Sequence, residues 1–290
     1  MHGIILKDVC YSYGNKKVLK NISVEIPSGM FGLLGRNGAG KTTMMKLITG
    51  LLPLQSGTIK VEGVSVTNIR ELRKNIGYLS QDFDFYHDMN VLEALHYLAV
   101  LDHIPRQISK KRVEELLDLV NLRDVSRDKV KALSGGMKRR LGIAQALLND
   151  PSVLIVDEPT AGLDPEERIR LRKLLGELAS KKTVLLSTHI TGDIESSTRN
   201  LAILNQGKMI YRGTIDDILE NTKNYTYEGI VSRDSFHDLD QAYHVYEQQD
   251  TLEGIRVKLL SGRPVGSGFT PTRPSLEAAY LNVLYGEGNR

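Results

Sequence analysis

The sequence lacks several features that define whole classes of protein. Its one cysteine, Cys10, excludes an intrachain disulfide and fits a reducing compartment. No apolar run reaches the roughly 18 to 20 residues that a membrane-spanning helix needs. Residues 1–8 also lack the layout of a signal peptide. We therefore expect any work at a membrane to be done through a partner.

The sequence also has little excess of one sign of charge and no low-complexity tract. The 38 basic and 35 acidic residues leave a net charge of +3. That balance gives no general nucleic-acid footprint, so no nucleic-acid partner is expected. The hydrophobic content of 41% is enough for a proper core, and 290 residues allow one large domain plus a smaller one.

The glycine-rich stretch from Gly35 to Thr43 is the strongest motif and fits G-x-x-x-x-G-K-[ST]. An apolar run at 30–34 precedes it and a run with helical spacing at 44–48 follows, which is the context of a P-loop. Its backbone N–H groups would face phosphates, with Lys41 at the β- and γ-phosphates and the Thr42 hydroxyl on Mg²⁺. The alternative is a glycine-rich turn that matches by chance. The predicted nucleotide-binding residues here are Gly35, Asn37, Gly38, Ala39, Gly40, Lys41, Thr42 and Thr43.

Short apolar runs alternate with helical patterns along the first 220 residues. Strands are predicted at 4–9, 22–26, 56–63, 76–80, 153–156, 183–187, 201–204 and 208–211. The alternation favours an α/β fold with an open, mostly parallel sheet, in which ligands bind at the carboxyl ends of strands. Four polar residues lie at such ends: Gln81, Asp157, Glu158 and His189.

The remaining pattern predicts two additions to this core. Residues 82–149 read as an inserted helical subdomain, so the core comprises 1–81 and 150–220. Residues 221–290 read as a small α+β domain. Its strands are expected near 225–231, 242–247 and 255–260, with a helix near 275–285.

Two carboxylates end the apolar strand at 153–156. Asp157 is placed to hold Mg²⁺, directly or through water. Glu158, one residue further, is placed to polarise an attacking water as a general base. Alone, this pair would be an ordinary strand-end turn, and the P-loop upstream is what favours catalysis.

Ser134, Gly135 and Gly136 form a second candidate phosphate site, because they precede a helical run. One chain has little use for two such sites unless both serve one nucleotide from opposite sides. We therefore expect two copies to meet head to tail, each giving this segment to the other's P-loop. The alternative is a serine N-cap before a glycine-rich turn.

Taken together, these motifs resemble the nucleotide-binding subunit of an ABC transporter, over residues 4 to about 215. The matching segments are Walker A at 35–42, the Q-loop at Gln81, the signature at 133–137, Walker B ending at Asp157 and Glu158, the D-loop at 161–164, and the switch histidine His189. The resemblance implies a P-loop NTPase (ABC ATPase) fold, ATP and Mg²⁺ as cofactors, and ATP hydrolysis.

The resemblance also implies individual roles. Tyr13 would stack on adenine, although a tyrosine packed at a sheet edge is the simpler reading of the residue alone. Gln81 would contact Mg²⁺ and signal to the membrane partner, and His189 would contact the γ-phosphate. The implied catalytic residues are Lys41, Gln81, Glu158 and His189. The implied metal ligands are Thr42, Gln81 and Asp157.

The implied partners are a second copy of the chain in the ATP-bound state and a separate transmembrane permease. The chain would lie peripherally on the cytoplasmic face of the cell membrane, with its docking groove near 82–110. Met137, where many importers have glutamine, and the ending at 274–280 are similar to the bacterial drug and lantibiotic exporter branch.

Two alternatives stay open. One is an ABC ATPase without a membrane partner, acting in translation or DNA repair. Against it, about 90 residues separate Thr43 from Ser134 with no sustained heptads, and the chain has one cassette. The other is a nucleotide sensor without catalysis, which the presence of Lys41, Asp157, Glu158 and His189 disfavours.

Overall fold

The computed structural model describes residues 3–286 of the chain, and their contacts divide into two compact units. The first unit runs to Thr198 and includes Leu204–Met209, and the second comprises Arg199–Ile203 and the chain from Ile210 on. The second unit begins before residue 220, where the sequence placed a boundary, because helix α8 (Ile215–Thr222) packs against helix α10 (Leu276–Tyr285).

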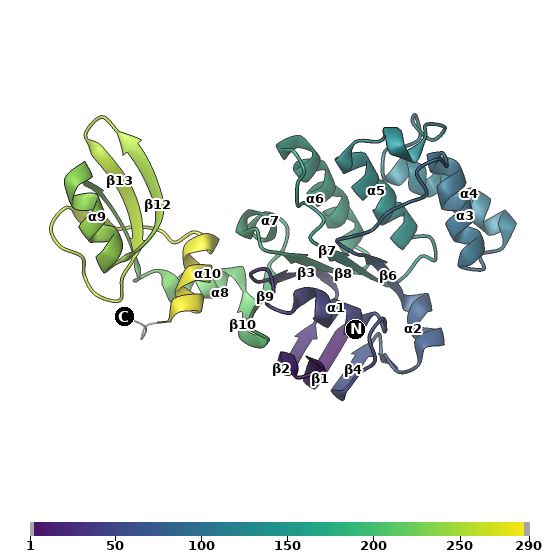
Figure 1. Cartoon of the computed structure of the whole chain (residues 1–290), viewed down its shortest axis with the longest axis horizontal. Helices are drawn as coiled ribbons and strands as arrows, with labels where there is room; N and C mark the ends of the chain where they lie inside the picture. Colours follow the sequence, from purple (N-terminus) through teal and green to yellow (C-terminus); the bar gives the residue numbers. More distant parts are fainter. Residues whose placement is uncertain (1–2, 287–290) are drawn as a thin grey trace. The chain divides into compact units, whose positions relative to one another are not determined.

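A parallel sheet lies at the centre of the first unit (Figure 1). Its strands, in spatial order, are β3 (Gly29–Leu34), β8 (Thr183–Thr188), β7 (Val153–Asp157) and β6 (Ile76–Leu79). Every residue of β7 and β8 is buried, which explains their continuous apolar sequences. The predicted parallel α/β core is therefore confirmed. The complete strand order of this sheet is β10-β9-β3-β8-β7-β6, with β9 at Asn200–Asn205 and β10 at Lys208–Thr214.

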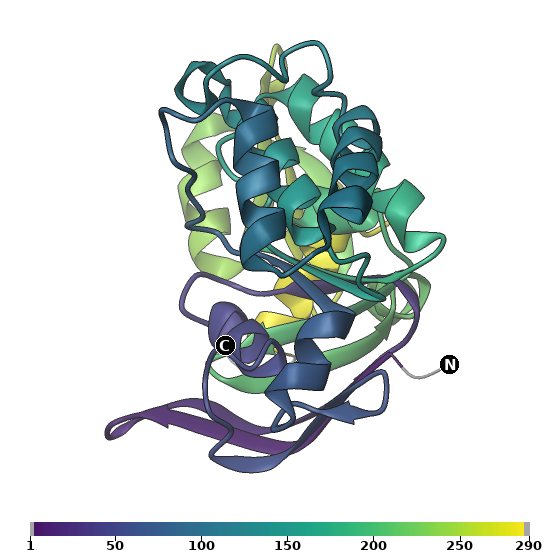
Figure 2. The same ribbon diagram turned by 90° about the vertical axis from the view of Figure 1, so that its right-hand side faces the viewer.

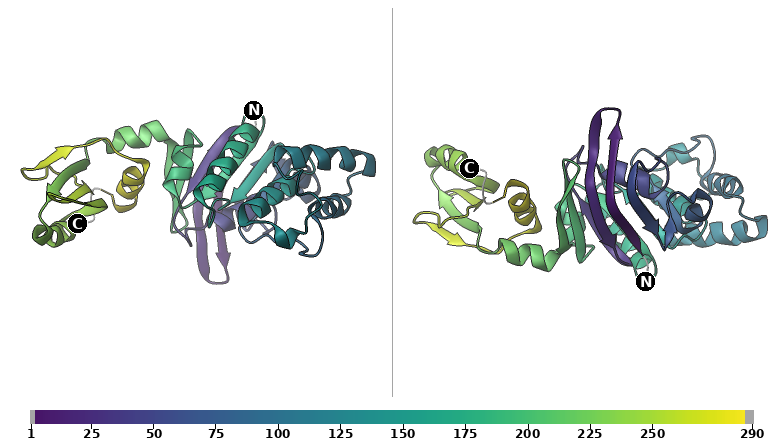
Figure 3. Two further views of the ribbon diagram at one scale, coloured as in Figure 1. Left: turned by 90° about the horizontal axis from the view of Figure 1, so that it is seen from above. Right: turned by 90° about the horizontal axis from the view of Figure 1, so that it is seen from below.

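An antiparallel sheet forms a second layer of the first unit. Its strands, in order, are β2 (Lys16–Ile26), β1 (Ile4–Tyr13), β4 (Ser56–Val61) and β5 (Val64–Ser65). Strands β1 and β2 are longer than the predicted 4–9 and 22–26, because Tyr11 pairs with Leu19 and Tyr13 with Lys16. Figure 3 shows the resulting hairpin projecting beyond the neighbouring strands of this unit.

Helices cover the parallel sheet from both faces. Helix α1 (Lys41–Ile48) contacts β7 and also β2 and β4, so it lies between the two sheets. Helices α6 (Pro165–Ala179) and α7 (Thr191–Glu195) pack against β3 and β8. The short helix α2 (Ile69–Asn75), which the sequence pattern did not predict, contacts β5 and β6.

The predicted helical insertion is present. It contains α3 (Val91–Leu101), α4 (Arg106–Leu119), a 3-10 turn (Val130–Ala132) and α5 (Gly135–Ala146). Figure 2 shows these helices grouped on one side of the parallel sheet. Asn90 begins α3 with a capping box, in which its side chain accepts from the Glu93 N–H and the Glu93 carboxylate accepts from the Asn90 N–H. Helix α5 packs against β6 and α6 and so joins the insertion to the core.

The second unit contains an antiparallel sheet of order β12-β13-β11-β14. Its strands are β11 (Thr226–Val231), β12 (His244–Thr251), β13 (Gly254–Leu260) and β14 (Phe269–Pro271). Helix α9 (Arg233–Ala242), which was not predicted, packs on β12 and β13 and has no fully buried residue. None of the helices within residues 3–286 is long and apolar enough to cross a bilayer.

Candidate functional site

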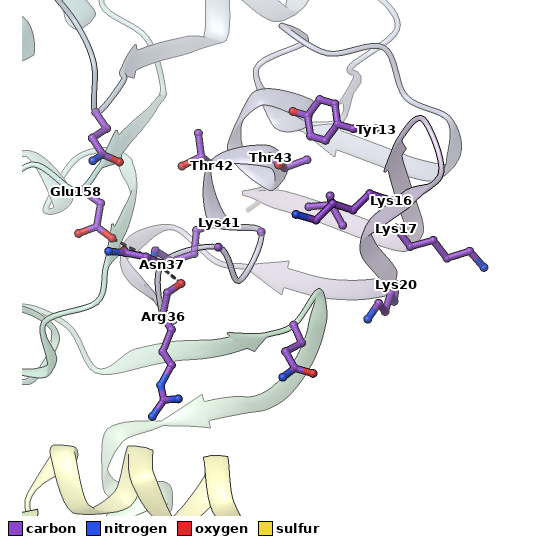
Figure 4. Close-up of a pocket in the computed structure, with 15 residues that line it drawn as sticks. Tyr13, Lys16, Lys17, Lys20, Arg36, Asn37, Lys41, Thr42, Thr43 and Glu158 are labelled. Atoms are coloured by element: carbon purple, nitrogen blue, oxygen red, sulfur yellow. Dashed lines mark hydrogen bonds and ion pairs between the residues drawn. The ribbon is translucent and has the colours of Figure 1, made fainter.

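A cavity of about 720 Å³ opens beside the glycine-rich loop of the first unit (Figure 4). It is bounded by the loop after β3, the start of α1, the β1–β2 hairpin, and the residues that follow β6 and β7. The predicted site residues that line it are Tyr13, Asn37, Gly38, Gly40, Lys41, Thr42, Thr43, Gln81 and Glu158. The structure thus gathers, at one edge of the sheet, residues that lie up to 145 positions apart in the sequence, from Tyr13 to Glu158.

Backbone contacts on several sides hold the loop between Gly35 and Gly40. The Gly35 N–H donates to the Thr188 carbonyl at 3.3 Å, and the Ala39 carbonyl accepts from the Gly207 N–H at 3.0 Å. Gly40 has φ of 110°, a conformation that favours glycine, and a Cβ there would lie 2.8 Å from Leu19 Cδ2. Gly35 and Ala39 are buried and are not among the residues that line the cavity. Their backbone hydrogen bonds hold the loop in place instead.

Lys41 points from the first turn of α1 into this buried edge. Its ammonium donates to the carbonyl oxygens of Gly35 at 2.6 Å and Arg36 at 3.3 Å. It also lies 3.0 Å from Glu158 Oε1, and both side chains are about 5% exposed. A charge pair this buried interacts much more strongly than one in water. The loop therefore holds a cation directly beneath its own N–H groups, where an anion would bind.

Thr42 and Asp157 place hydroxyl and carboxylate oxygens together at the same edge. The Thr42 hydroxyl donates to Asp157 Oδ2 at 2.7 Å, and the Ser187 hydroxyl donates to Oδ1 at 2.6 Å. Asp157 is fully buried. Such hard oxygen donors suit Mg²⁺. Burial and the charge of Asp157 raise the pKa of the nearby Tyr78 phenol, which therefore stays neutral and adds no further negative charge.

Glu158 joins Lys41 to His189. Its Oε1 faces Lys41, and its Oε2 lies 2.7 Å from His189 Nδ1. The residue has φ of 50°, a left-handed conformation that costs a non-glycine residue on the order of 1 kcal/mol or more. The Glu158 N–H donates to the Ser187 carbonyl at 3.0 Å, so β8 holds this turn in place. The turn aims the carboxylate back toward the glycine-rich loop.

Comparison with known proteins agrees with this geometry. A sequence profile described as ABC transporter matches residues 19–161. An uncharacterized ABC transporter ATP-binding protein of Nostoc sp. is 34% identical over 286 residues, covering 93% of this chain and 84% of the relative. The chain belongs to the family of ABC transporter ATP-binding proteins. Members of this family bind and hydrolyse ATP, so the chain is an ATPase with the P-loop NTPase fold.

Other relatives of this ABC ATPase differ in the direction of transport that their names give. The Nod factor export ATP-binding protein I of Burkholderia orbicola is 37% identical, covering 75% of this chain and 73% of the relative. The methionine import ATP-binding protein of Carboxydothermus hydrogenoformans is 34% identical, covering 75% and 68%. Among solved structures, cbiO1 from Clostridium perfringens, part of the ABC transporter complex cbiONQ, superposes with a TM-score of 0.70. It is 28% identical and covers 76% of this chain and 91% of that one.

The signature segment of this ABC ATPase lies away from the cavity. Ser134 caps α5 and accepts from the Met137 N–H at 3.2 Å. Gly136 packs against the Glu167 side chain, and Glu167 also pairs with the largely buried Arg140. Among the described residues that line the cavity, none comes from Ser134, Gly135 or Gly136. A second copy supplying this segment therefore stays a prediction.

The sequence reasoning missed several residues that line the cavity. They are Lys16, Lys17, Val18, Lys20, Arg36 and Gln206. Figure 4 shows the three lysines with Tyr13 on the side opposite Glu158, and Lys41 between. The sequence feature that could have pointed to these residues is the pair Lys16 and Lys17, which closely follows Gly14. This pair becomes informative only when the β1–β2 hairpin is known to line the same cavity as the P-loop.

Tyr13 gives a prediction about nucleotide affinity. Its ring lines the cavity, is 47% exposed and contacts Tyr11 edge-on with centroids 5.0 Å apart. If it stacks on a base, Tyr13→Ala should weaken ATP binding by about 5- to 100-fold, because such stacking contributes about 1–3 kcal/mol. Tyr13→Phe serves as the control and should retain affinity. Equal ATP dissociation constants for Tyr13→Ala and wild type, measured by calorimetry, would exclude stacking.

Proposed function

We propose that this chain is the ATP-hydrolysing subunit of an exporter and drives a separate transmembrane permease. The observation that carries the proposal is the contact chain Lys41–Glu158–His189 beside the pair Thr42–Asp157, all at the carboxyl ends of adjacent parallel strands. This arrangement combines a phosphate-binding cation, a general-base candidate and oxygen ligands for a divalent cation. A nucleotide sensor without catalysis would not need all three.

In the proposed mechanism the protein mainly positions charges. Thr42, Asp157 and Gln81 would hold Mg²⁺, which would neutralise charge on the phosphates. Lys41 leaves Glu158 and turns its ammonium to the phosphate oxygens, which compete with the carboxylate for the same cation. Glu158, released from Lys41, then accepts a proton from the attacking water, whose oxygen bonds to the terminal phosphorus as the bond from that phosphorus to ADP breaks and ADP leaves. His189 stays beside Glu158 and orients its carboxylate, and its second ring nitrogen is available to the terminal phosphate.

We further propose that ATP joins two copies of the chain. Ser134 begins a helix whose first N–H groups offer an anion-binding terminus, yet within the described chain this terminus does not reach the cavity. A second copy, placed head to tail, would bring it to the far side of the nucleotide. ATP binding would then close the dimer, and hydrolysis would reopen it.

The proposed membrane partner would dock on the helical insertion. Several large apolar or aromatic side chains of this region are exposed in the first unit: Tyr86, Tyr97, Val100, Leu101 and Ile108. The Tyr86 and Tyr97 rings also contact each other edge-on, with centroids 5.4 Å apart. Such a patch is typical of a protein interface. Through it the chain would be held peripherally on the cytoplasmic face of the cell membrane.

A photo-crosslinking experiment tests the partner. A photoreactive residue at position 86 should crosslink a co-expressed transmembrane subunit, because Tyr86 is 62% exposed within the patch. The same residue at position 252 is the control, since Leu252 is fully exposed in the second unit. Transport that persists while position 86 gives no crosslink would contradict the docking surface. Co-sedimentation with ribosomes or DNA, instead of membranes, would favour the alternative of an ABC ATPase without a permease.

Export is the finer part of this proposal. It is supported by the exporter-like sequence features at Met137 and at 274–280, and by the similarity to the Nod factor export protein. The methionine import relative shows that similar chains also serve importers. Uptake into inverted membrane vesicles, as opposed to right-side-out vesicles, would measure the direction.

A further inference from the structure

We infer that Arg139, with Phe83 and Gly142, clamps the segment carrying Gln81 and so positions Gln81 for the proposed hydrolysis. Gln81 follows β6, lines the nucleotide cavity and is exposed. Residues 80–87, which include Gln81, form no helix or strand. A side chain on such a segment needs contacts from elsewhere to keep one position.

Arg139 supplies the first contact. It lies on α5, the helix whose first turn carries the signature residues, and its Nη1 donates to the Gln81 carbonyl at 2.9 Å. A guanidinium donor makes this hydrogen bond stronger than a neutral one. An arginine guanidinium stays protonated in a protein, so the side chain is a cation close to Asp82, the acidic residue that follows Gln81.

Phe83 supplies the second contact. The Arg139 guanidinium lies over its ring, 5.2 Å from the centroid. The edge of the same ring and the Leu79 side chain fill the space beside Gly142, where a Cβ would lie 2.8 Å from Phe83 Cε2, 2.9 Å from Phe83 Cζ and 2.6 Å from Leu79 Cδ1. Gly142 follows Arg139 by three positions, so both lie on one face of α5. The helix thus holds Phe83 by its face and its edge, two residues beyond Gln81.

These contacts link the signature segment, which begins α5, to Gln81 in the nucleotide cavity. Movement of α5, which carries Ser134 at its start, would move the backbone of Gln81 with it. Arg139 is therefore a positioning residue: it acts on the cavity through Gln81. This inference rests on the proposed function, because the role of Gln81 toward Mg²⁺ belongs to that proposal.

The test has two independent readouts. Hydrogen–deuterium exchange on the full chain without nucleotide should show faster exchange of amides 80–87 in Arg139→Met. ATPase assays should show kcat lowered about tenfold, as expected for one lost charge-assisted hydrogen bond, and the KM for ATP within about twofold. The Mg²⁺ concentration for half-maximal rate should rise about three- to tenfold. Gly142→Ala, which displaces Phe83 and also Leu79 at the end of β6, should change all three quantities in the same direction.

Lys138→Met is the control for charge alone: Lys138 lies in the same turn of α5 and its charge acts on the exposed Asp84 carboxylate of the segment, whereas Arg139 bonds the Gln81 backbone. It should leave the exchange of amides 80–87 and the Mg²⁺ requirement within about twofold of wild type. Unchanged exchange in Arg139→Met overturns the clamp, whatever the ATPase rate. Faster exchange with unchanged kcat and Mg²⁺ requirement overturns its role in positioning. A wild-type chain without ATPase activity refutes the proposed function instead, and the exchange result then still decides whether the clamp exists.

Discussion

Replacing Glu158 by glutamine should lower the ATPase kcat by about 100- to 10,000-fold, because it removes the proposed general base. The substitution keeps the size of the side chain and an oxygen for His189. It removes the charge that pairs with Lys41 at 3.0 Å. Lys41 retains its bond to the Gly35 carbonyl, so the loop should keep its shape. Since phosphate no longer competes with a carboxylate for Lys41, ATP should bind as tightly as in wild type or more tightly.

The same variant should trap a dimer when ATP and Mg²⁺ are added. Sedimentation velocity would detect it, with the ATPase assay run on the same sample. Glu166→Gln is the control, because Glu166 lies in the first turn of α6 with its side chain 83% exposed. It should behave as wild type in both assays. Wild-type turnover by Glu158→Gln would refute the assignment of the base, and a variant that stays monomeric with ATP bound would refute the head-to-tail dimer.

The parallel core could be predicted because its chemistry is local. Strands that are covered on both faces have unbroken apolar sequences, as β7 and β8 do. The P-loop has a fixed pattern of residue types. Since parallel strands share one carboxyl edge, Gln81, Asp157, Glu158 and His189 were expected at that edge. The structure places all four there.

The contacts within that edge could not be predicted from spacing. Glu158 meets His189, 31 positions later, because β7 and β8 are neighbours with Asp157 opposite Ser187, and because the chain turns at Glu158 with a positive φ. The residue type does not predict that turn, because glutamate rarely adopts a positive φ. Sequence reasoning therefore assigned Glu158 and His189 separate roles and missed that they touch.

The hairpin and the second unit show a different limit. Tyr11 and Tyr13 continue the pairing of β1 with β2, although polar residues interrupt the apolar pattern there. Helix α9 buries no residue fully and has few apolar residues, Phe236 and Leu239 among them, so its short amphipathic pattern was overlooked. Weakly buried elements owe their form to tertiary partners, and the sequence pattern records those partners poorly.

Replacing Lys41 by methionine should abolish detectable hydrolysis, with a loss of at least about 1,000-fold. It should also weaken ATP binding by more than about tenfold, because the loop loses the cation beneath its N–H groups. Lys46→Met, later on the same helix, is the control and should bind and hydrolyse ATP as wild type. Calorimetry and a phosphate-release assay measure the two quantities. Hydrolysis by Lys41→Met near the wild-type rate would refute the phosphate-binding role.

The Lys41 variant also tests the buried charge chain without any nucleotide. Losing Lys41 leaves the Glu158 carboxylate, 3% exposed, without its ammonium partner and in contact with His189 Nδ1. We expect the free energy of unfolding to fall by about 1–3 kcal/mol, since an unpaired buried charge is destabilising. Adding Glu158→Gln removes that charge and should restore part of the loss. Additive effects in this double-mutant cycle would show that the two side chains do not interact, and that Lys41 is not held by Glu158 before phosphate binds.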